Sequence, residues 1–126
     1  MILATLALFQ QQPLFTPGPV TSEAQACERL QIIASYIMME VPMQQDAVRR
    51  LDSVTVTCGQ KTFAANHTAL VPMTELPRDW RETTLRNWSA VVCEGEDLGP
   101  VARRGWHFVQ IVTFRTGDQV TLEAHC

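Results

Sequence analysis

The chain has 126 residues, of which 46% are hydrophobic and 18% are charged. This composition is typical of one globular domain with a substantial core, and it excludes extensive disorder. Ten basic and 13 acidic residues give a net charge of −3, which argues against a nucleic-acid-binding protein, because such proteins gather an excess of basic side chains on one face.

Residues 1–20 are predicted to lie outside the folded domain, which we place at residues 21–126. They comprise an uncharged apolar run, MILATLALF, and a linker rich in glutamine and proline. The run has the length of the apolar part of a signal peptide but lacks a positively charged start and a clear cleavage site. It is too short to span a bilayer. A signal sequence, an uncleaved anchor and an apolar arm packed on the domain are all compatible with it.

The first predicted helix runs from Glu23 to Val41 and is ended by Pro42. Ser22 and Gln25 form the pattern of a capping box at its start. One side carries an apolar stripe that faces the core: Cys27, Leu30, Ile33, Ala34, Ile37, Met38 and Val41. The other side carries a second, narrower apolar line: Ile32, Tyr36 and Met39. We interpret this line either as a contact with the N-terminal arm or a long loop, or as a surface for a protein partner.

Two strands and a second helix are predicted in the middle of the chain. Residues 51–58 alternate between apolar and hydroxyl side chains, as in a half-buried strand. Residues 61–71 predict a weaker strand, one side of which carries Phe63, Ala65, His67 and Ala69. Two prolines then break the chain before a less regular helix over residues 78–93. Residues 94–105 are predicted as a loop or a single helical turn that begins at a proline and ends at a glycine.

The clearest pattern is the hairpin predicted for residues 106–126. Two runs of β-forming residues flank Thr116-Gly117-Asp118, which is typical of antiparallel strands around a tight turn. If Gly117 closes a three-residue loop, Val112 pairs with Val120, and the core-facing side carries Phe108, Val112, Val120 and Leu122. A two-residue loop would instead shift the register and place His107 and His125 on opposite faces.

The predicted order α-β-β-α-β-β indicates an α+β domain, in which an antiparallel sheet of about four strands is covered on one face by two helices. The four cysteines are too far apart for a zinc knuckle or a CxxC redox motif and indicate two disulfides in an oxidising compartment. The alternative is four buried thiols in a cytosolic protein. A helix runs antiparallel to the strand that follows it, which predicts the pairs Cys27 with Cys58 and Cys93 with Cys126.

The histidines suggest a metal site. In the three-residue-loop register His107 lies across from His125, with Glu123 on the same side. These side chains could bind Zn²⁺ or Cu²⁺ if His67 came over from the second strand. Otherwise no cofactor is predicted, and the histidines are ordinary solvent-facing residues of a strand.

The sequence therefore favours a small exported domain, periplasmic or secreted, that is stabilised by disulfides and binds an unknown protein partner or a second copy of itself. One alternative is a small metal-dependent or hydrolytic enzyme that uses His107, His125 and His67. Another is a carrier of a small apolar ligand, held among the tryptophans and phenylalanines between helices and sheet. The GxSxG, HExxH, P-loop and GxGxxG motifs are absent from the sequence, and no transmembrane span is predicted.

Overall fold

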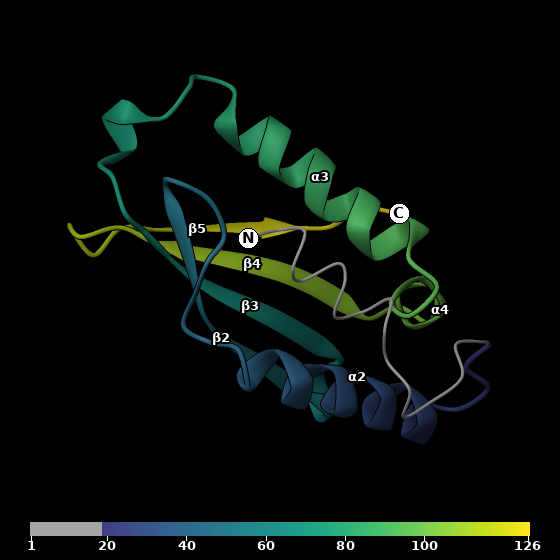
Figure 1. Cartoon of the computed structure of the whole chain (residues 1–126). Coiled ribbons are helices and arrows are strands. Elements are labelled where there is room, and N and C mark those ends of the chain that lie inside the picture. Colours follow the sequence, from purple (N-terminus) through teal and green to yellow (C-terminus); the bar gives the residue numbers. More distant parts are fainter. Residues whose placement is uncertain (1–18) are drawn as a thin grey trace.

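The computed structural model describes residues 19–126, so the predicted apolar run and most of the linker lie outside the described residues. Helices α2 and α3 cover the same face of one sheet, as predicted (Figure 1). The helices and strands follow in this order: α2 (Glu23–Met38), β1 (Met43–Gln44), β2 (Arg49–Thr57), β3 (Thr62–Ala69), α3 (Trp80–Glu94), α4 (Gly99–Ala102), β4 (His107–Thr113) and β5 (Gln119–Glu123). None of the described helices is long and apolar enough to cross a membrane.

The sheet has five strands in the order β1-β2-β3-β4-β5, one more than predicted. The additional strand, β1, has two residues, which are too few to show the alternation by which a strand is predicted. All neighbouring strands are antiparallel except β3 and β4, which are parallel. The chain passes from β3 to β4 through α3, and such a crossover produces parallel strands. The predicted antiparallel sheet is therefore correct except at this central pair.

Helix α2 begins where the capping pattern predicts. The Ser22 hydroxyl accepts a hydrogen bond from the backbone N–H of Gln25 at 3.1 Å, while the Gln25 side chain accepts one from the backbone N–H of Thr21 at 2.9 Å. The helix ends at Met38, earlier than predicted, because the chain turns before Pro42. The buried side of α2 consists of Ala26, Leu30, Ile33, Ala34 and Ile37.

The core lies between the helices and the covered face of the sheet. Phe63 of β3 and Phe108 of β4 are fully buried, and their ring centroids are 5.4 Å apart. Trp88 connects α3 to β4, because its indole Nε1 donates a hydrogen bond to the backbone oxygen of Phe108 at 2.9 Å. A smaller apolar cluster lies under the start of α3. There Trp80 packs edge-on against Phe114, with the ring centroids 5.9 Å apart.

A β-bulge in β2 determines which side chains face the helices. The register with β3 shifts between Leu51 and Ser53, which leaves one extra residue in β2 and reverses the alternation there. Arg49 and Leu51 consequently face the helices, together with Val54. Arg50 lies on the opposite face, which no described helix covers and which we call the uncovered face; its Nε is 2.6 Å from Oδ1 of Asp52.

The hairpin has the register predicted for the three-residue loop. The backbone N–H of Phe114 donates to the oxygen of Asp118, and that of Gly117 donates to the oxygen of Phe114. Gly117 has a φ of 92°, which glycine adopts without the steric cost that a Cβ would cause. Val112 pairs with Val120, so the apolar side of the hairpin faces the core.

Both disulfides form in the predicted pairs. Cys27 is joined to Cys58 and Cys93 to Cys126, with Cα–Cα distances of 5.6 Å and 5.5 Å. The first disulfide connects the beginning of α2 to the end of β2. The second connects the end of α3 to the C-terminal residue.

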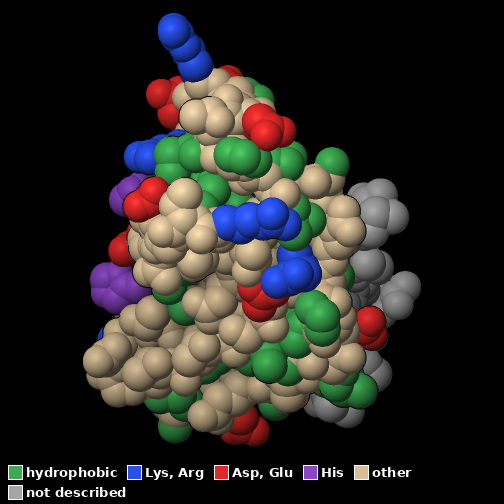
Figure 2. All heavy atoms as spheres, turned by 90° about the vertical axis from the view of Figure 1, so that its left-hand side faces the viewer, with side chains coloured by type: hydrophobic (Ala, Val, Ile, Leu, Met, Phe, Trp, Pro, Cys, Tyr) green, Lys and Arg blue, Asp and Glu red, His purple; other side chains and the backbone are tan. Residues whose placement is uncertain are grey.

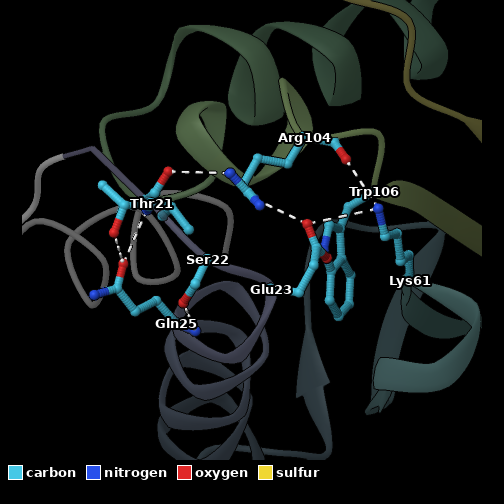
Figure 3. A network of polar contacts seen from close by, with 8 residues as sticks. Thr21, Ser22, Glu23, Gln25, Lys61, Arg104 and Trp106 are labelled. Atoms are coloured by element: carbon cyan, nitrogen blue, oxygen red, sulfur yellow. Dashed lines mark hydrogen bonds and ion pairs between the residues drawn. The ribbon is translucent and has the colours of Figure 1, made fainter.

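A polar network also connects α2 to two later segments of the chain (Figure 3). We call Glu23, Lys61, Arg104 and Trp106 the Glu23 network. Oε1 of Glu23 lies 2.9 Å from Nε of Arg104 and 3.5 Å from Nζ of Lys61. Its Oε2 accepts a hydrogen bond from the indole Nε1 of Trp106 at 3.1 Å. The first turn of α2 is therefore held by side chains from the connection after β2 and from the segment before β4.

Candidate functional site

A cavity of about 270 Å³ lies between α2, α3 and the sheet. Its walls are mostly apolar and consist of Ile37 from α2, Trp88 and Val91 from α3, and Leu51, Val54 and Phe63 from the sheet. Asp46 and Asn87 also line the cavity and are exposed. The mouth of the cavity therefore lies between the loop before β2 and the outer side of α3.

The cavity exists because a small side chain occupies the centre of the sheet. Ala65 lies between Phe63 and His67 on the side of β3 that faces the helices, and it lines the cavity. Interiors of proteins are normally filled to close packing. A leucine or methionine at position 65 would take up part of this volume, whereas alanine leaves it open.

Arg49 is the only cationic side chain among the described residues that line the cavity. The side chain is 15% exposed, and its Nη1 donates to Oε1 of Gln110 at 2.9 Å. The Asp46 carboxylate is 3.8 Å from Nη2 and 40% exposed, so solvent weakens this ion pair. Burial lowers the pKa of Arg49 and the Asp46 charge opposes the shift, but a guanidinium keeps its charge in proteins.

His67 lines the cavity as a neutral side chain. It is 4% exposed, and its Nδ1 has no hydrogen-bond partner among residues 19–126. Burial and then the Arg49 charge lower the pKa of His67 to about 4, although the backbone of Ala65 and the carboxylates of Asp52 and Asp46 oppose the shift. At neutral pH the imidazole therefore offers hydrogen bonding without a charge.

Gln45 adds a second unpaired group to the same wall. Its Nε2 is buried and has no partner in the described part of the chain, and its backbone N–H donates to the Arg49 oxygen at 2.9 Å. Buried polar atoms are nearly always hydrogen-bonded. We call Gln45, Asp46, Arg49, His67 and Gln110 the polar cluster; it is the part of the cavity suited to hold the polar group of a ligand.

The three histidines predicted as metal ligands do not come together. His67 faces the helices, whereas His107 pairs with Thr62 of β3 and points to the opposite face of the sheet. Nδ1 of His107 lies 2.8 Å from Oε2 of Glu123, and His125 follows the end of β5. In the described chain no group of three His, Cys, Asp or Glu side chains is placed to hold a metal ion. The predicted ligand set is therefore not assembled.

The apolar line predicted as a partner surface lies on the outer side of α2. Ile32 and Tyr36 are partly exposed and Met39 is 79% exposed. None of the three belongs to the buried clusters of the described residues. A partner for this surface stays a prediction.

Gln110 and Arg49 are site residues that the sequence patterns did not predict. Gln110 lies between Phe108 and Val112, in phase with the buried side of β4. A polar residue at such a core position is a signal that could have identified it, and His67 has the same signal in β3. Arg49 has no such signal, because the bulge reverses the alternation before Ser53.

Charged side chains of both signs lie on one face of the molecule. Figure 2 shows the side of the molecule that is on the left in Figure 1, and acidic and basic side chains are interspersed on this face. Nucleic-acid-binding proteins instead carry a continuous basic patch.

Comparison with known proteins shows the fold. No protein-family profile matches the chain, and the curated proteins provide no match. Among solved structures, the chain is similar to a candidate secreted protein of Pseudomonas aeruginosa, with a TM-score of 0.65 and 14% sequence identity over 84% of this chain and 94% of that one. At this identity the similarity shows a shared fold, from which function does not follow.

Proposed function

We propose that this protein is a small exported binding domain that holds a small molecule in the cavity between α2, α3 and the sheet. The observation that carries the proposal is that one cavity combines apolar walls with Arg49, Gln110 and the buried His67. Ligand sites are typically apolar hollows with a few convergent polar groups. An interior selected for stability alone would be filled and would leave few buried nitrogens unpaired.

The cysteines support export. All four form disulfides, and structural disulfides are typical of the periplasm and the extracellular space, where thiols are oxidised. The similar structure from Pseudomonas aeruginosa is also described as a candidate secreted protein, which agrees with this compartment.

Binding is better supported than catalysis. No free thiol exists in residues 19–126, and the described residues that line the cavity include neither serine nor cysteine. The hydroxyl groups there belong to Thr83 and Thr84 of α3. Nucleophilic catalysis requires a hydroxyl or thiol within hydrogen-bond reach of a base, and no hydrogen bond joins either threonine to His67.

Titration of ¹⁵N-labelled protein by NMR tests the proposal. The probes are aromatic and aliphatic compounds of about ten non-hydrogen atoms, larger than the benzene that fills a cavity of about 150 Å³. Binding in the cavity should shift the backbone amides of Ala65 and Thr84 and the indole N–H of Trp88. Ala65→Met should occupy part of the cavity from the sheet and Thr84→Phe part of it from α3, so both variants should bind the probes more weakly and show smaller shifts.

Ala64→Met is the matched control, because Ala64 lies on the uncovered face of β3, where a larger side chain leaves the cavity unchanged. This variant should bind the probes as the wild type does. The proposal is overturned if no compound shifts the cavity resonances of the wild type at millimolar concentration. It is also overturned if both cavity-filling variants remain folded and bind with unchanged affinity.

A further inference from the structure

We infer that the cavity binds a small amphipathic anion, a carboxylate joined to an apolar body, with the carboxylate on Arg49. This inference rests on the proposed function and names the chemical class of its ligand. Three features of the cavity carry it: the charge of Arg49, the neutral donors beside it, and the apolar walls.

The Arg49 charge is largely withdrawn from solvent but only weakly compensated by the described residues. Its close hydrogen-bond partner, Gln110, is neutral, and the Asp46 carboxylate lies at 3.8 Å in a partly exposed position. A guanidinium presents a planar fork of N–H donors that matches the two oxygens of a carboxylate. A ligand carboxylate would therefore supply the close negative partner that the folded chain does not.

The groups beside Arg49 suit a single negative charge. The unpaired Nε2 of Gln45 is a donor, and the neutral imidazole of His67 can donate from one ring nitrogen. A phosphate would bring nearly two negative charges to a cluster that has one cation and already contains Asp46. A cationic ligand is disfavoured as well, because the positive charge of Arg49 would repel it.

The remainder of the cavity suits the apolar body. Its walls include Trp88, Val91 and Ile37 on the helix side and Phe63 on the sheet side. These side chains carry no charge that could bind a second polar group of the ligand. The volume of about 270 Å³ exceeds the roughly 150 Å³ that holds benzene. A phenyl ring or a short alkyl chain with a carboxylate is therefore of the right size.

The test compares two probes that differ in charge and share one apolar body, 3-phenylpropanoate and 3-phenylpropanamide. Dissociation constants at pH 7 are obtained from the NMR shifts of Ala65, Thr84 and the Trp88 indole. The wild type should bind the carboxylate about tenfold more tightly than the amide, the difference expected for a charge-assisted hydrogen bond. Arg49→Gln should lose this preference and bind the two probes with similar affinity.

Arg50→Gln is the matched control, because Arg50 is adjacent in sequence but lies on the uncovered face beside Asp52; it should keep the wild-type preference. Arg49→Lys keeps the positive charge without the fork and should keep part of the preference. The anion inference is overturned if the amide binds the wild type as tightly as the carboxylate, or if folded Arg49→Gln retains the preference. In these outcomes the proposed function survives, whereas binding of no probe of any charge would overturn both.

Discussion

Protonation of His67 should determine much of the acid sensitivity of the protein. An unperturbed histidine titrates near pH 6.5, but burial lowers the pKa of His67 to about 4 in the folded chain. Between these values the unfolded state binds a proton that the folded state does not bind. The contribution of His67 to stability is therefore complete above pH 6.5 and is lost as the pH falls to about 4. A shift of this size corresponds to about 3 kcal/mol.

Urea denaturation of the wild type and of His67→Gln at several pH values checks this prediction. Glutamine does not titrate, so the free energy of unfolding of the variant should fall less steeply below pH 6.5. The difference between the two curves isolates His67 from the carboxylates, which titrate in both proteins. Parallel curves would contradict the prediction.

At the residue scale, the sequence contained the information that His67 and His107 lie on opposite faces of the sheet. His67 lies four residues after Phe63 and therefore on the same side of its strand, whereas His107 is adjacent to Phe108 and therefore on the opposite side from it. Both phenylalanines are buried. The two histidines must therefore lie on opposite faces of any sheet that buries both aromatic rings. The pattern that excludes His67 as a ligand beside His107 also identifies it as a polar residue in a core position.

At the scale of elements, the Glu23 network should hold the start of α2 against the segment before β4. Partial desolvation raises the pKa of the Glu23 carboxyl. The hydrogen bonds from Arg104 and Trp106 and the charges of Lys61 and Arg104 outweigh this effect and lower the pKa below 4.5. Its contribution to stability is therefore present above pH 4.5 and is lost as the pH falls through the lowered pKa.

Glu23→Gln should lower the melting temperature at pH 7 by roughly 2 to 4 °C, because it removes the charge of a partly exposed network. Below pH 4.5 the difference from the wild type should shrink, since the wild-type carboxyl also becomes neutral. Glu28→Gln is the control, because Glu28 is an exposed residue of the same helix. Scanning calorimetry measures all three proteins, and an equal effect of both substitutions would refute a specific role for Glu23.

Elements with a strong local pattern were predicted well. The cap at Ser22 and the turn at Gly117 are local chemistry, so the start of α2 and the register of the hairpin followed from a few neighbouring residues. β1 was not predicted, because two residues are too few to show the alternation of apolar and polar side chains. The parallel pairing of β3 with β4 also depends on where α3 packs, which local patterns do not encode.

For the whole molecule, each disulfide closes a loop of similar length, with sequence separations of 31 and 33. The chain-entropy relation gives roughly 3 to 4 kcal/mol for each loop. Replacing either pair by serine should therefore reduce the free energy of unfolding by a similar amount, measured by urea denaturation under oxidising conditions. A variant with both pairs replaced should be largely unfolded at 37 °C. A double variant as stable as the wild type would show that neither loop constrains the unfolded chain.

The fold class and disulfide pairs could be predicted because they follow from the order of elements, whereas the cavity could not. A cavity is the volume that remains after all side chains have packed, so it depends on Ala65 together with residues from α2, α3 and three strands. The sequence shows that Trp88 and Phe63 are large and apolar. It does not show that an alanine between them leaves room for a ligand.

The bulge in β2 has a consequence for how the site could change during evolution. Because Asp52 is the extra residue between Leu51 and Ser53, deletion of one codon there would restore simple alternation. Leu51 would still pair with His67 and Ser53 with Asn66, so Arg49 and Leu51 would continue to face the helices. Such a deletion would remove only the contacts of Asp52 with Arg50 and Thr68 on the other face, so the polar side of the cavity tolerates the loss of the bulge residue.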